Sequence, residues 1–251
     1  MNVLKNKIVL HIPHSSVNIP FVDGYVVDRI SLEKEMLKLT DWYTDDLFHS
    51  DQDDMVVADF SRIFCDPERF TDDSQEVMYQ FGMGVLYEKN DAGEQMRLVA
   101  PELKERVLSE YYWKHHNKLS SAVNNQLELF GKALILDCHS YPSKPFIRDL
   151  DQTPNRPDFN IGTDEYHTPQ ELIEHSILFF ENKGFSLGVD YPYKGSIVPL
   201  EHYQKNRNVQ TIMLEINRGL YLNEPTNEKS KMYADIKLVV QEFIESIKVF
   251  T

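Results

Sequence analysis

Short apolar runs alternate with longer stretches of helical periodicity along this chain, and this alternation restricts the fold more than any other feature of the sequence. The clearest run, Lys132–His139, contains Ala-Leu-Ile-Leu and predicts a buried strand. It follows a helical pattern from Pro101 to Phe130, in which proline is well placed at the first turn. Strands that alternate with helices favour a mostly parallel sheet between helical layers, so we expect an α/β fold.

The same pattern predicts further elements on both sides of this strand. The helical stretch Ser31–His49 is expected to form two pieces that meet near Thr40, and Thr40 is a candidate N-cap of the second piece. In sheets of this kind the active site lies at the carboxyl ends of the strands, so the residues that follow each apolar run are candidate site residues. Strands are expected at Lys7–Ile12, Met55–Phe60, Phe185–Val189 and Gln210–Ile216, and helices at Ser31–His49, Pro169–Lys183 and Glu228–Val249.

Composition limits the partners of the chain. Its 251 residues show no linker, so we expect one domain spanning residues 1–251. A formal net charge of −14 without a cluster of lysine and arginine argues against nucleic acid as a partner. No stretch approaches the roughly 18 apolar residues of a membrane span, and Ile8–Leu10 is too short for the core of a signal peptide. We expect a cytoplasmic protein that binds a small molecule. Cys65 and Cys138 are expected to be buried thiols. The sequence does not define the oligomeric state.

Three polar segments follow predicted strands and should therefore meet on one rim of the sheet. The histidines in two of these segments indicate a metal, because a catalytic zinc ion has three protein ligands and one open position. Asp41, Asp45 and Asp46 are candidates for a third, acidic ligand. The segments are Pro13-His14-Ser15-Ser16, Asp137-Cys138-His139-Ser140 and Glu215-Ile216-Asn217-Arg218.

The other histidines and Asp137 are interpreted from their place in each element. The two-residue period of a strand puts Asp137 on the same face as His139, where its carboxylate can orient the imidazole or a neighbouring group. His11 points away from His14 and is expected in the core or as an orienting residue. His115 and His116 are adjacent on the long helix and are expected to be solvated. Against a metal site, a lone histidine at a strand end more often forms an ordinary hydrogen bond.

Glu215 ends a buried strand, where a carboxylate is costly unless it is paired or functional. One interpretation is an ion pair with Arg218 or another arginine, and the other is a general base that accepts a proton from zinc-bound water. Arg62, Arg69 and Arg218 are candidate anion-binding residues because a guanidinium can bind a carboxylate through two hydrogen bonds, although the default role of each is a surface salt bridge. Lys194 adds one cation on a polar, flexible loop.

Taken in order, these motifs resemble the N-formylglutamate amidohydrolase family. The resemblance runs from the start of the chain to Tyr221 and rests on the joint order and spacing of individually weak pieces. The pieces are Pro13-His14-Ser15 with Pro20, Asp41-Trp42 with Leu47, Ser61-Arg62 with Asp66, Asp137-Cys138-His139-Ser140, Pro157-Asp158-Phe159-Asn160-Ile161-Gly162-Thr163, Lys194-Gly195 and Leu214-Glu215-Ile216-Asn217-Arg218.

This resemblance implies a three-layer α/β/α sandwich with a mixed sheet, similar to zinc carboxypeptidases, and hydrolysis of a linear amide to formate and glutamate. It implies one zinc ion per chain, held by His14, Asp41 and His139. Glu215 is then the general base and Arg62 the arginine that stabilises the developing oxyanion. The residues expected to hold the substrate are Arg69, Arg218, Lys194, His116 and Asn160.

Glu68 departs from the family pattern. The family often has Asp-x-Asn-Arg where this chain has Asp66-Pro67-Glu68-Arg69. Asparagine donates and accepts hydrogen bonds, whereas ionised glutamate only accepts and would repel an anionic substrate. The expected substrate is thus N-formylglutamate or another N-acyl amino acid. The alternatives are a zinc carboxypeptidase-like or deacylase enzyme acting on another amide, and a catalytically inert relative that binds a small molecule.

Overall fold

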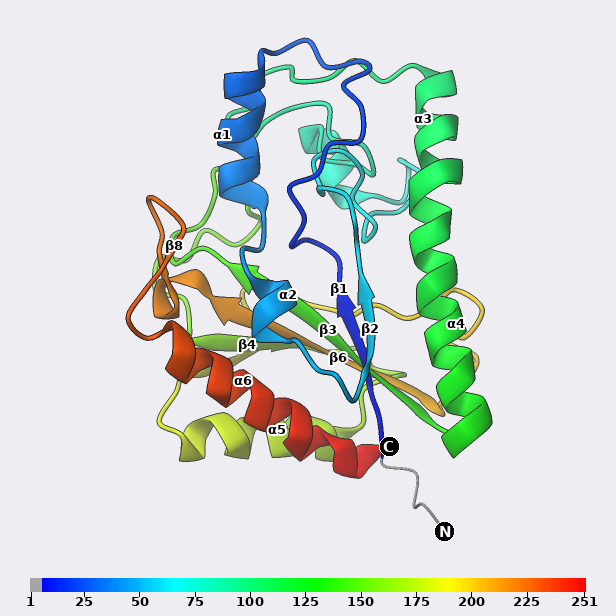
Figure 1. The fold of residues 1–251 in the computed structure, drawn as a ribbon, viewed down its shortest axis with the longest axis vertical. Helices are drawn as coiled ribbons and strands as arrows, with labels where there is room; N and C mark the ends of the chain where they lie inside the picture. The colour runs from blue at the N-terminus through cyan, green and yellow to red at the C-terminus, as the bar shows by residue number, and fades with distance from the viewer. Residues whose placement is uncertain (1–5) are drawn as a thin grey trace.

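A computed structural model describes residues 6–251 and has a six-stranded sheet at its centre (Figure 1). The strands lie in the order β2-β1-β3-β6-β4-β5. The predicted single domain begins at Met1, so residues 1–5 of that prediction lie outside the described part of the chain. The strand bounds are Val9–Ile12 for β1, Asp54–Val57 for β2, Ala133–Tyr141 for β3, Phe159–Gly162 for β4, Leu187–Val189 for β5 and Val209–Asn217 for β6.

Neighbouring strands in the sheet are parallel except at the β6–β4 pair, which is antiparallel. This mixed, mostly parallel sheet confirms the predicted α/β class. β3 and β6 pair along their whole length, from Ala133 opposite Val209 to Tyr141 opposite Asn217. The register also places His139 opposite Glu215, so two predicted site residues are neighbours in the sheet.

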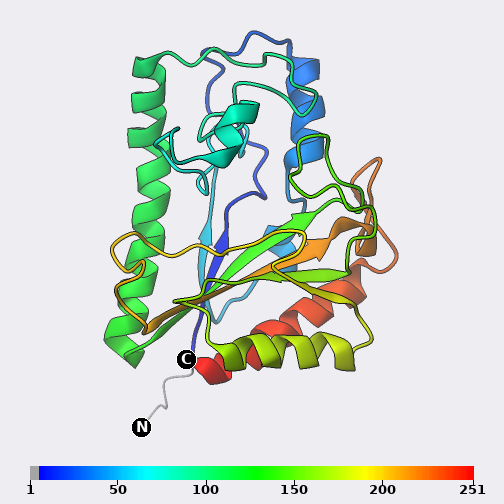
Figure 2. The same cartoon turned by 180° about the vertical axis from the view of Figure 1, so that it is seen from behind.

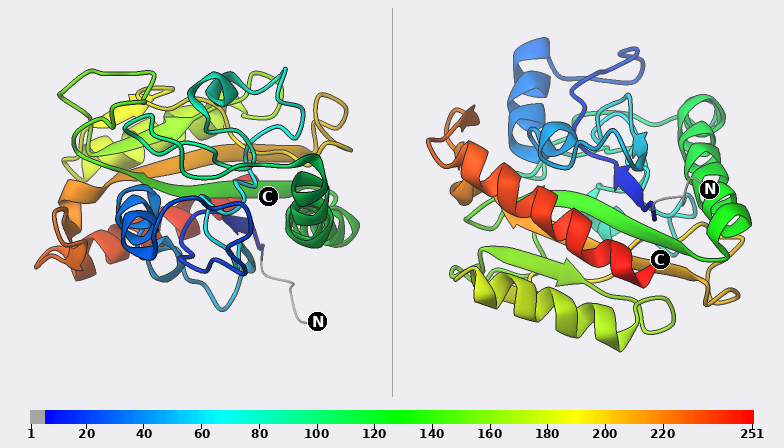
Figure 3. Two further views of the ribbon diagram at one scale, coloured as in Figure 1. Left: turned by 90° about the horizontal axis from the view of Figure 1, so that it is seen from above. Right: turned by 60° about the horizontal axis from the view of Figure 1, so that its bottom comes forward.

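Helices cover both faces of the sheet and complete a three-layer arrangement (Figures 1 and 3). On one face, α4 (Trp113–Phe130) packs Leu119 and Val123 against Val9 and Ile135. On the other face lie α5 (Gln170–Asn182) and α6 (Tyr233–Ile247), which share a larger apolar core with the strands.

The alternation of side chains along the two central strands decides which residues reach the site. Leu134 and Leu136 of β3 belong to the core beneath α5 and α6, so Asp137 and His139 share the opposite face. β6 follows the same rule, because its even-numbered apolar residues enter that core and Glu215 lines the cavity with His139. The predicted faces of both strands are confirmed.

The predicted helix from Pro101 to Phe130 is one continuous rod with an irregular turn (Figure 2). α3 (Pro101–Val107) leads into a π-helical turn at Leu108–Tyr112 and then into α4. A π turn shifts the phase of the side chains that follow it. His115, which was expected in solvent, is only 2% exposed because its face of α4 packs on the sheet. That prediction was wrong.

Two predicted boundaries also change. The stretch Ser31–His49 does form two helices, α1 (Arg29–Leu39) and α2 (Thr44–Leu47). Thr40, however, ends α1 instead of starting α2, because its backbone N–H donates to the Met36 carbonyl. The other change is at the final helix, which begins only at Tyr233 because the preceding residues form a small hairpin. The hairpin strands are β7 (Leu222–Asn223) and β8 (Glu228–Lys229), and the short 3₁₀ turns are η1 (Val77–Phe81), η3 (Arg218–Leu220) and η4 (Lys248–Phe250).

Two further expectations concern the chain as a whole. Cys65 and Cys138 are free, fully buried thiols, as predicted. Among residues 6–251, no helix combines the length and the apolar character that crossing a membrane requires.

Candidate active site

A cavity of about 380 Å³ lies where β1, β3 and β6 end. Its inner wall, which we call the reaction end, carries His14, Asp41, His139 and Glu215. The three polar segments therefore meet on one rim, as predicted, although two of them lie largely in the last residues of β3 and β6 instead of following these strands. The cations that line the same cavity are Arg62, Arg69, Arg148, Lys194 and Arg218.

The two histidines turn the same ring nitrogen toward Asp41. The Asp41 Oδ2 atom lies 3.3 Å from His139 Nδ1 and 3.7 Å from His14 Nδ1. Ligands about 2.0–2.1 Å from a tetrahedral ion stand roughly 3.3–3.4 Å apart, which is close to these separations. His14 Nδ1 is buried and has no hydrogen-bond partner in the described residues. Each imidazole thus stands from Asp41 at a separation that a shared divalent cation requires.

The opposite ring nitrogens are bound to carboxylates. His14 Nε2 lies 2.9 Å from Asp66 Oδ1, and His139 Nε2 lies 3.1 Å from Asp137 Oδ1. Metal-binding histidines usually donate their second N–H to such an acceptor, which fixes the tautomer and the ring orientation. The geometry of Asp137 agrees with the orienting role predicted for it. The same role for Asp66 was missed, because an irregular segment carries no periodicity from which its direction can be inferred.

Asp41 is held in place by backbone and by one arginine. Its N–H donates to the His14 carbonyl at 3.0 Å, which ties the end of α1 to the segment after β1. Arg218 Nη2 donates to Asp41 Oδ1 at 2.8 Å, leaving Oδ2 toward the histidines. The carboxylate is 2% exposed, and its position is therefore defined by contacts on every side.

Charge coupling shifts the pKa of each of these groups. Burial alone would lower the pKa of His139, but Glu68 and Asp137 outweigh it and raise that pKa well above its ordinary value. The pKa of His14 is also raised, since Asp66 and Asp41 outweigh burial and Arg62. Without a metal, both imidazoles therefore hold protons more tightly than usual, and a divalent cation would have to displace those protons.

Glu215 sits beside this cluster as a buried carboxyl group. Its Oε2 atom has no hydrogen-bond partner in the described residues. Burial raises the pKa of Glu215 to about 8, with His139 acting in the opposite direction. No ion pair with Arg218 within 4.0 Å is present in residues 6–251, which leaves the general-base interpretation as the better supported one.

Glu68 reaches the histidines from the other side. Its Oε2 atom lies 3.2 Å from His139 Nε2 and 3.7 Å from His14 Nε2. Among residues 6–251, the groups with all ligand atoms close enough to hold a metal ion are His14 with Glu68 and His139, and His11 with Glu68 and Asp137; Asp41 is in neither. We favour Asp41 as the third ligand, because both Nε2 atoms already have carboxylate partners and His14 Nδ1 has none. Glu68 faces imidazoles in this arrangement, which lessens the repulsion of an anionic substrate that was expected from it.

Arg62 and Arg69 occupy the side wall of the cavity. Arg62 Nε donates to the Tyr87 hydroxyl at 3.3 Å and Nη2 donates to Asp66 at 3.1 Å. Its Nη1 atom is left 3.7 Å from Asp41 Oδ1, facing the reaction end. Arg69 Nε is buried, 3.7 Å from Asp66, without a hydrogen bond. Both arginines therefore keep donors for a ligand.

Arg218 uses four of its five N–H donors within the protein. Its Nε bonds to the Ser140 hydroxyl, Nη1 to the Lys38 carbonyl, and Nη2 to both Asp41 and the Ser140 carbonyl. It lines the cavity, but its hydrogen bonds position Asp41. Lys194 is exposed and forms no ion pair with any residue from 6 to 251, so it is free to meet an anion.

Two residues expected to bind substrate instead hold loops. His116 Nε2 donates to the Pro67 carbonyl at 2.8 Å, and burial lowers the pKa of His116 to about 4. Asn160 donates to the Tyr193 carbonyl and accepts from the Tyr191 N–H. Neither side chain is among those that line the cavity. Their contacts position the segments that carry Glu68 and Lys194.

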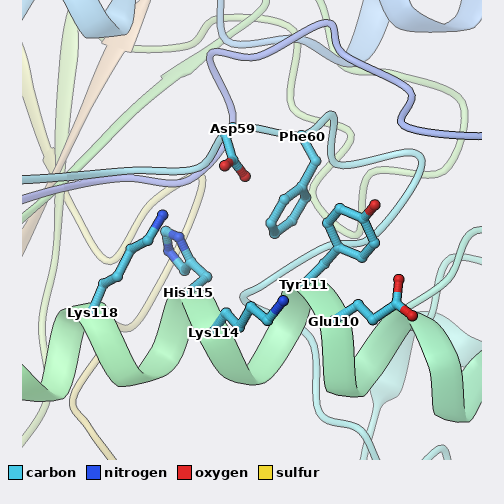
Figure 4. A pocket seen from close by; sticks show the side chains of 7 residues that line it. All are labelled: Asp59, Phe60, Glu110, Tyr111, Lys114, His115 and Lys118. Atoms are coloured by element: carbon cyan, nitrogen blue, oxygen red, sulfur yellow. The ribbon is translucent and has the colours of Figure 1, made fainter.

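His11 extends the hydrogen-bonded network behind His139. Its Nδ1 atom lies 2.8 Å from Asp137 Oδ1 and its Nε2 atom lies 2.8 Å from His115 Nε2. This orienting role matches the one predicted for His11. His115 also lines a smaller cavity of about 250 Å³ along α4, where lysines and acids are mixed (Figure 4).

Together these contacts describe a site suited to hydrolysis of a carbonyl compound. The donor set of two imidazoles and one carboxylate has the chemistry of a zinc site. His14 Nδ1 is buried without a hydrogen-bond partner in the described residues, which is the state expected of an atom that binds a metal. A buried glutamate and a free guanidinium nitrogen lie on either side of this set. The fold and these groups are typical of an amidohydrolase of the α/β class.

Residues 6–222 match the N-formylglutamate amidohydrolase family, and the chain belongs to that family. It is 22% identical to the N-formylglutamate deformylase of Pseudomonas putida over 252 residues, covering 96% of this chain and 91% of the relative. The corresponding enzyme of Pseudomonas aeruginosa is 25% identical over 254 residues, covering 96% and 92%. The resemblance inferred from the motifs is thereby confirmed.

Solved structures show the same fold. The N-formylglutamate amidohydrolase of Ralstonia eutropha JMP134 superposes with a TM-score of 0.84 at 24% identity, covering 98% of this chain and 94% of the other. The Agrobacterium tumefaciens gene product Atu2144 gives a TM-score of 0.66 at 13% identity, covering 98% and 92%. The α/β architecture is thus shared across nearly the full length of both proteins.

Proposed function

We propose that this chain hydrolyses the formyl amide of N-formyl-L-glutamate, releasing formate and glutamate, with one zinc ion held by His14, Asp41 and His139. The observation that carries the proposal is the convergence of two Nδ1 atoms on one Asp41 oxygen beside the buried Glu215. Family membership and the deformylase names of the relatives support the choice of substrate. When bound, the zinc ion would polarise the substrate carbonyl and lower the pKa of water toward ~7.

Glu215 would move the proton. Its carboxylate accepts a proton from the attacking water as the oxygen of that water bonds to the formyl carbon. The same proton then passes to the amide nitrogen, so that the C–N bond breaks and glutamate leaves as an amine. With its pKa raised to about 8, Glu215 holds a proton at neutral pH in the metal-free site, and a cation bound beside it would lower that pKa and free the carboxylate to act as the base.

Arg62 would stabilise the charge that develops on the carbonyl oxygen. Tyr87 and Asp66 occupy its Nε and Nη2 atoms and so hold the guanidinium rigid. Nη1 remains as a fixed donor that needs no reorganisation during the reaction. Arg69 and Lys194 would bind the α-carboxylate of the substrate, whereas Arg218 would position Asp41, because four of its five N–H donors already bind the protein.

A second candidate keeps the site and changes the substrate. Glu68 stands where the family often has asparagine, and this observation favours another N-acyl amino acid or a carboxypeptidase-like amide. An inert binding relative has less support, because the three proposed ligands and Glu215 are all present.

The experiment is a substrate panel on the purified protein with added zinc. We expect formate release from N-formyl-L-glutamate to exceed hydrolysis of N-acetyl-L-glutamate and of a dipeptide by at least about tenfold, and to stop after chelation until zinc is restored. Faster hydrolysis of the acetyl or peptide amide would select the deacylase or carboxypeptidase alternative. Binding of these compounds without hydrolysis of any would select the inert relative.

A further inference from the structure

One guanidinium in the cavity lacks a carboxylate partner. Arg62, Arg69 and Arg218 each have an acidic oxygen within 4.0 Å. Arg148 lines the same cavity, and no carboxylate in residues 6–251 forms an ion pair within 4.0 Å with its guanidinium. A half-buried cation without a counter-ion is costly, and a bound anion would offset that cost.

The surrounding backbone holds Arg148 in place from one side. Its N–H donates to Asp91 Oδ1 at 3.2 Å and its Nε donates to the Asp91 carbonyl at 3.1 Å. Its Nη2 atom packs against Gly93, where an added Cβ would stand 2.6 Å away and where φ is +89°. Glycine therefore leaves room for the guanidinium at this turn. Nη1 is buried and forms no hydrogen bond with the described residues.

Arg148 lines the cavity from a loop, whereas His139 and Glu215 line it from strands. It lies on the loop after β3, which runs beside α1 (Figure 2), and Phe146 of the same loop packs in the cluster that contains Leu39 at the end of α1. Asp149, its neighbour, accepts hydrogen bonds from Arg156 and Tyr193 and is thereby already compensated. In a chain with a net charge of −14, the binding of an anion depends on such local cations.

We propose that Arg148 binds the side-chain carboxylate of the substrate and makes the enzyme selective for N-acyl derivatives of acidic amino acids. This inference rests on the proposed amidohydrolase function and adds the residue that selects the side chain. Bidentate binding of a carboxylate by a guanidinium gives both energy and orientation, so glutamate would be preferred over its neutral isostere glutamine.

The test compares N-formyl-L-glutamate with N-formyl-L-glutamine on the wild type, Arg148→Met, Arg148→Lys and Lys144→Met. We expect Arg148→Met to lower kcat/KM for formylglutamate by about 10- to 100-fold, mainly through KM, while formylglutamine changes less than about threefold. Arg148→Lys should keep part of the preference. Lys144, exposed on the same loop, is the matched control and should leave both substrates unchanged.

Equal losses on both substrates would show that Arg148 only clamps the loop to Asp91, and no loss on either would remove it from recognition. Both results overturn the inference. Binding of the two compounds to the Glu215→Gln variant, with and without Arg148→Met, gives a readout independent of turnover. If the wild type hydrolyses neither compound, the proposed function fails, and a selective loss of formylglutamate binding would still support the role of Arg148.

Discussion

The two ends of the cavity are built from different parts of the fold. The reaction end comes mainly from the ends of paired strands, with Asp41 added from the end of α1, and its histidines have a carboxylate on each side. The outer end, which we define by Arg148 and Lys194, comes from loops and carries cations without ion pairs among residues 6–251. Strand ends hold reacting atoms in fixed positions, whereas loops carry charged side chains with which a substrate of opposite charge can pair. Substitutions at the reaction end should therefore affect rate or metal, and those at the outer end affinity and selectivity.

Glu215→Gln should produce the largest change in rate. Glutamine has nearly the same shape but cannot accept and return a proton, so kcat should fall by about 10²- to 10⁴-fold. The zinc content should stay at the wild-type level, because Glu215 is not among the proposed ligands. Steady-state kinetics and elemental analysis of the same preparation measure both quantities. A loss below tenfold would reassign Glu215 to a structural role.

Arg62→Met should have the next largest effect. Removing one preorganised donor to an oxyanion costs about 10²- to 10³-fold in kcat in comparable sites. The KM for formylglutamate should change little, which separates this residue from Arg148 and sharpens the contrast between the two ends. A loss that appears in KM alone would place Arg62 with the substrate-binding cations.

Asp137→Asn should weaken metal binding more than it slows the chemistry. The carboxylate orients His139 and raises its basicity, so zinc affinity should fall about 10- to 100-fold, as measured by competition with a chelator. Asp53→Asn is a matched control, because Asp53 is a buried carboxylate paired with Lys248. Unchanged affinity in Asp137→Asn, or an equal loss in both variants, would contradict the orienting role.

The reaction end was largely predictable because strand geometry constrains it. Once Lys132–His139 and Gln210–Ile216 are identified as strands, period and polarity place His139 and Glu215 on one rim. The choice of Asp41 as the acidic ligand rested only on the family resemblance, because the residues alone did not distinguish it from Asp45 and Asp46. The single domain, the cytoplasmic location and the zinc ion stay predictions.

The outer end was not predictable for a related physical reason. Loops have no periodicity, so nothing in the sequence gives the direction of Arg148 or shows that Gly93 makes room for it. The same limit hid the contact of Asp66 with His14, because the segment that carries Asp66 is irregular. His115 was misplaced because adjacent histidines on a helix were expected in solvent, whereas the face of α4 that carries His115 packs on the sheet.

The most direct measurement is the zinc content of the wild type, His14→Ala, His139→Ala and His116→Ala after equal exposure to zinc, with circular dichroism to show that each variant is folded. We predict one ion per chain in the wild type and in His116→Ala, and less than about a tenth of an ion in the other two. A full ion retained by His14→Ala and His139→Ala would contradict the convergence of their Nδ1 atoms and Asp41 on a single cation.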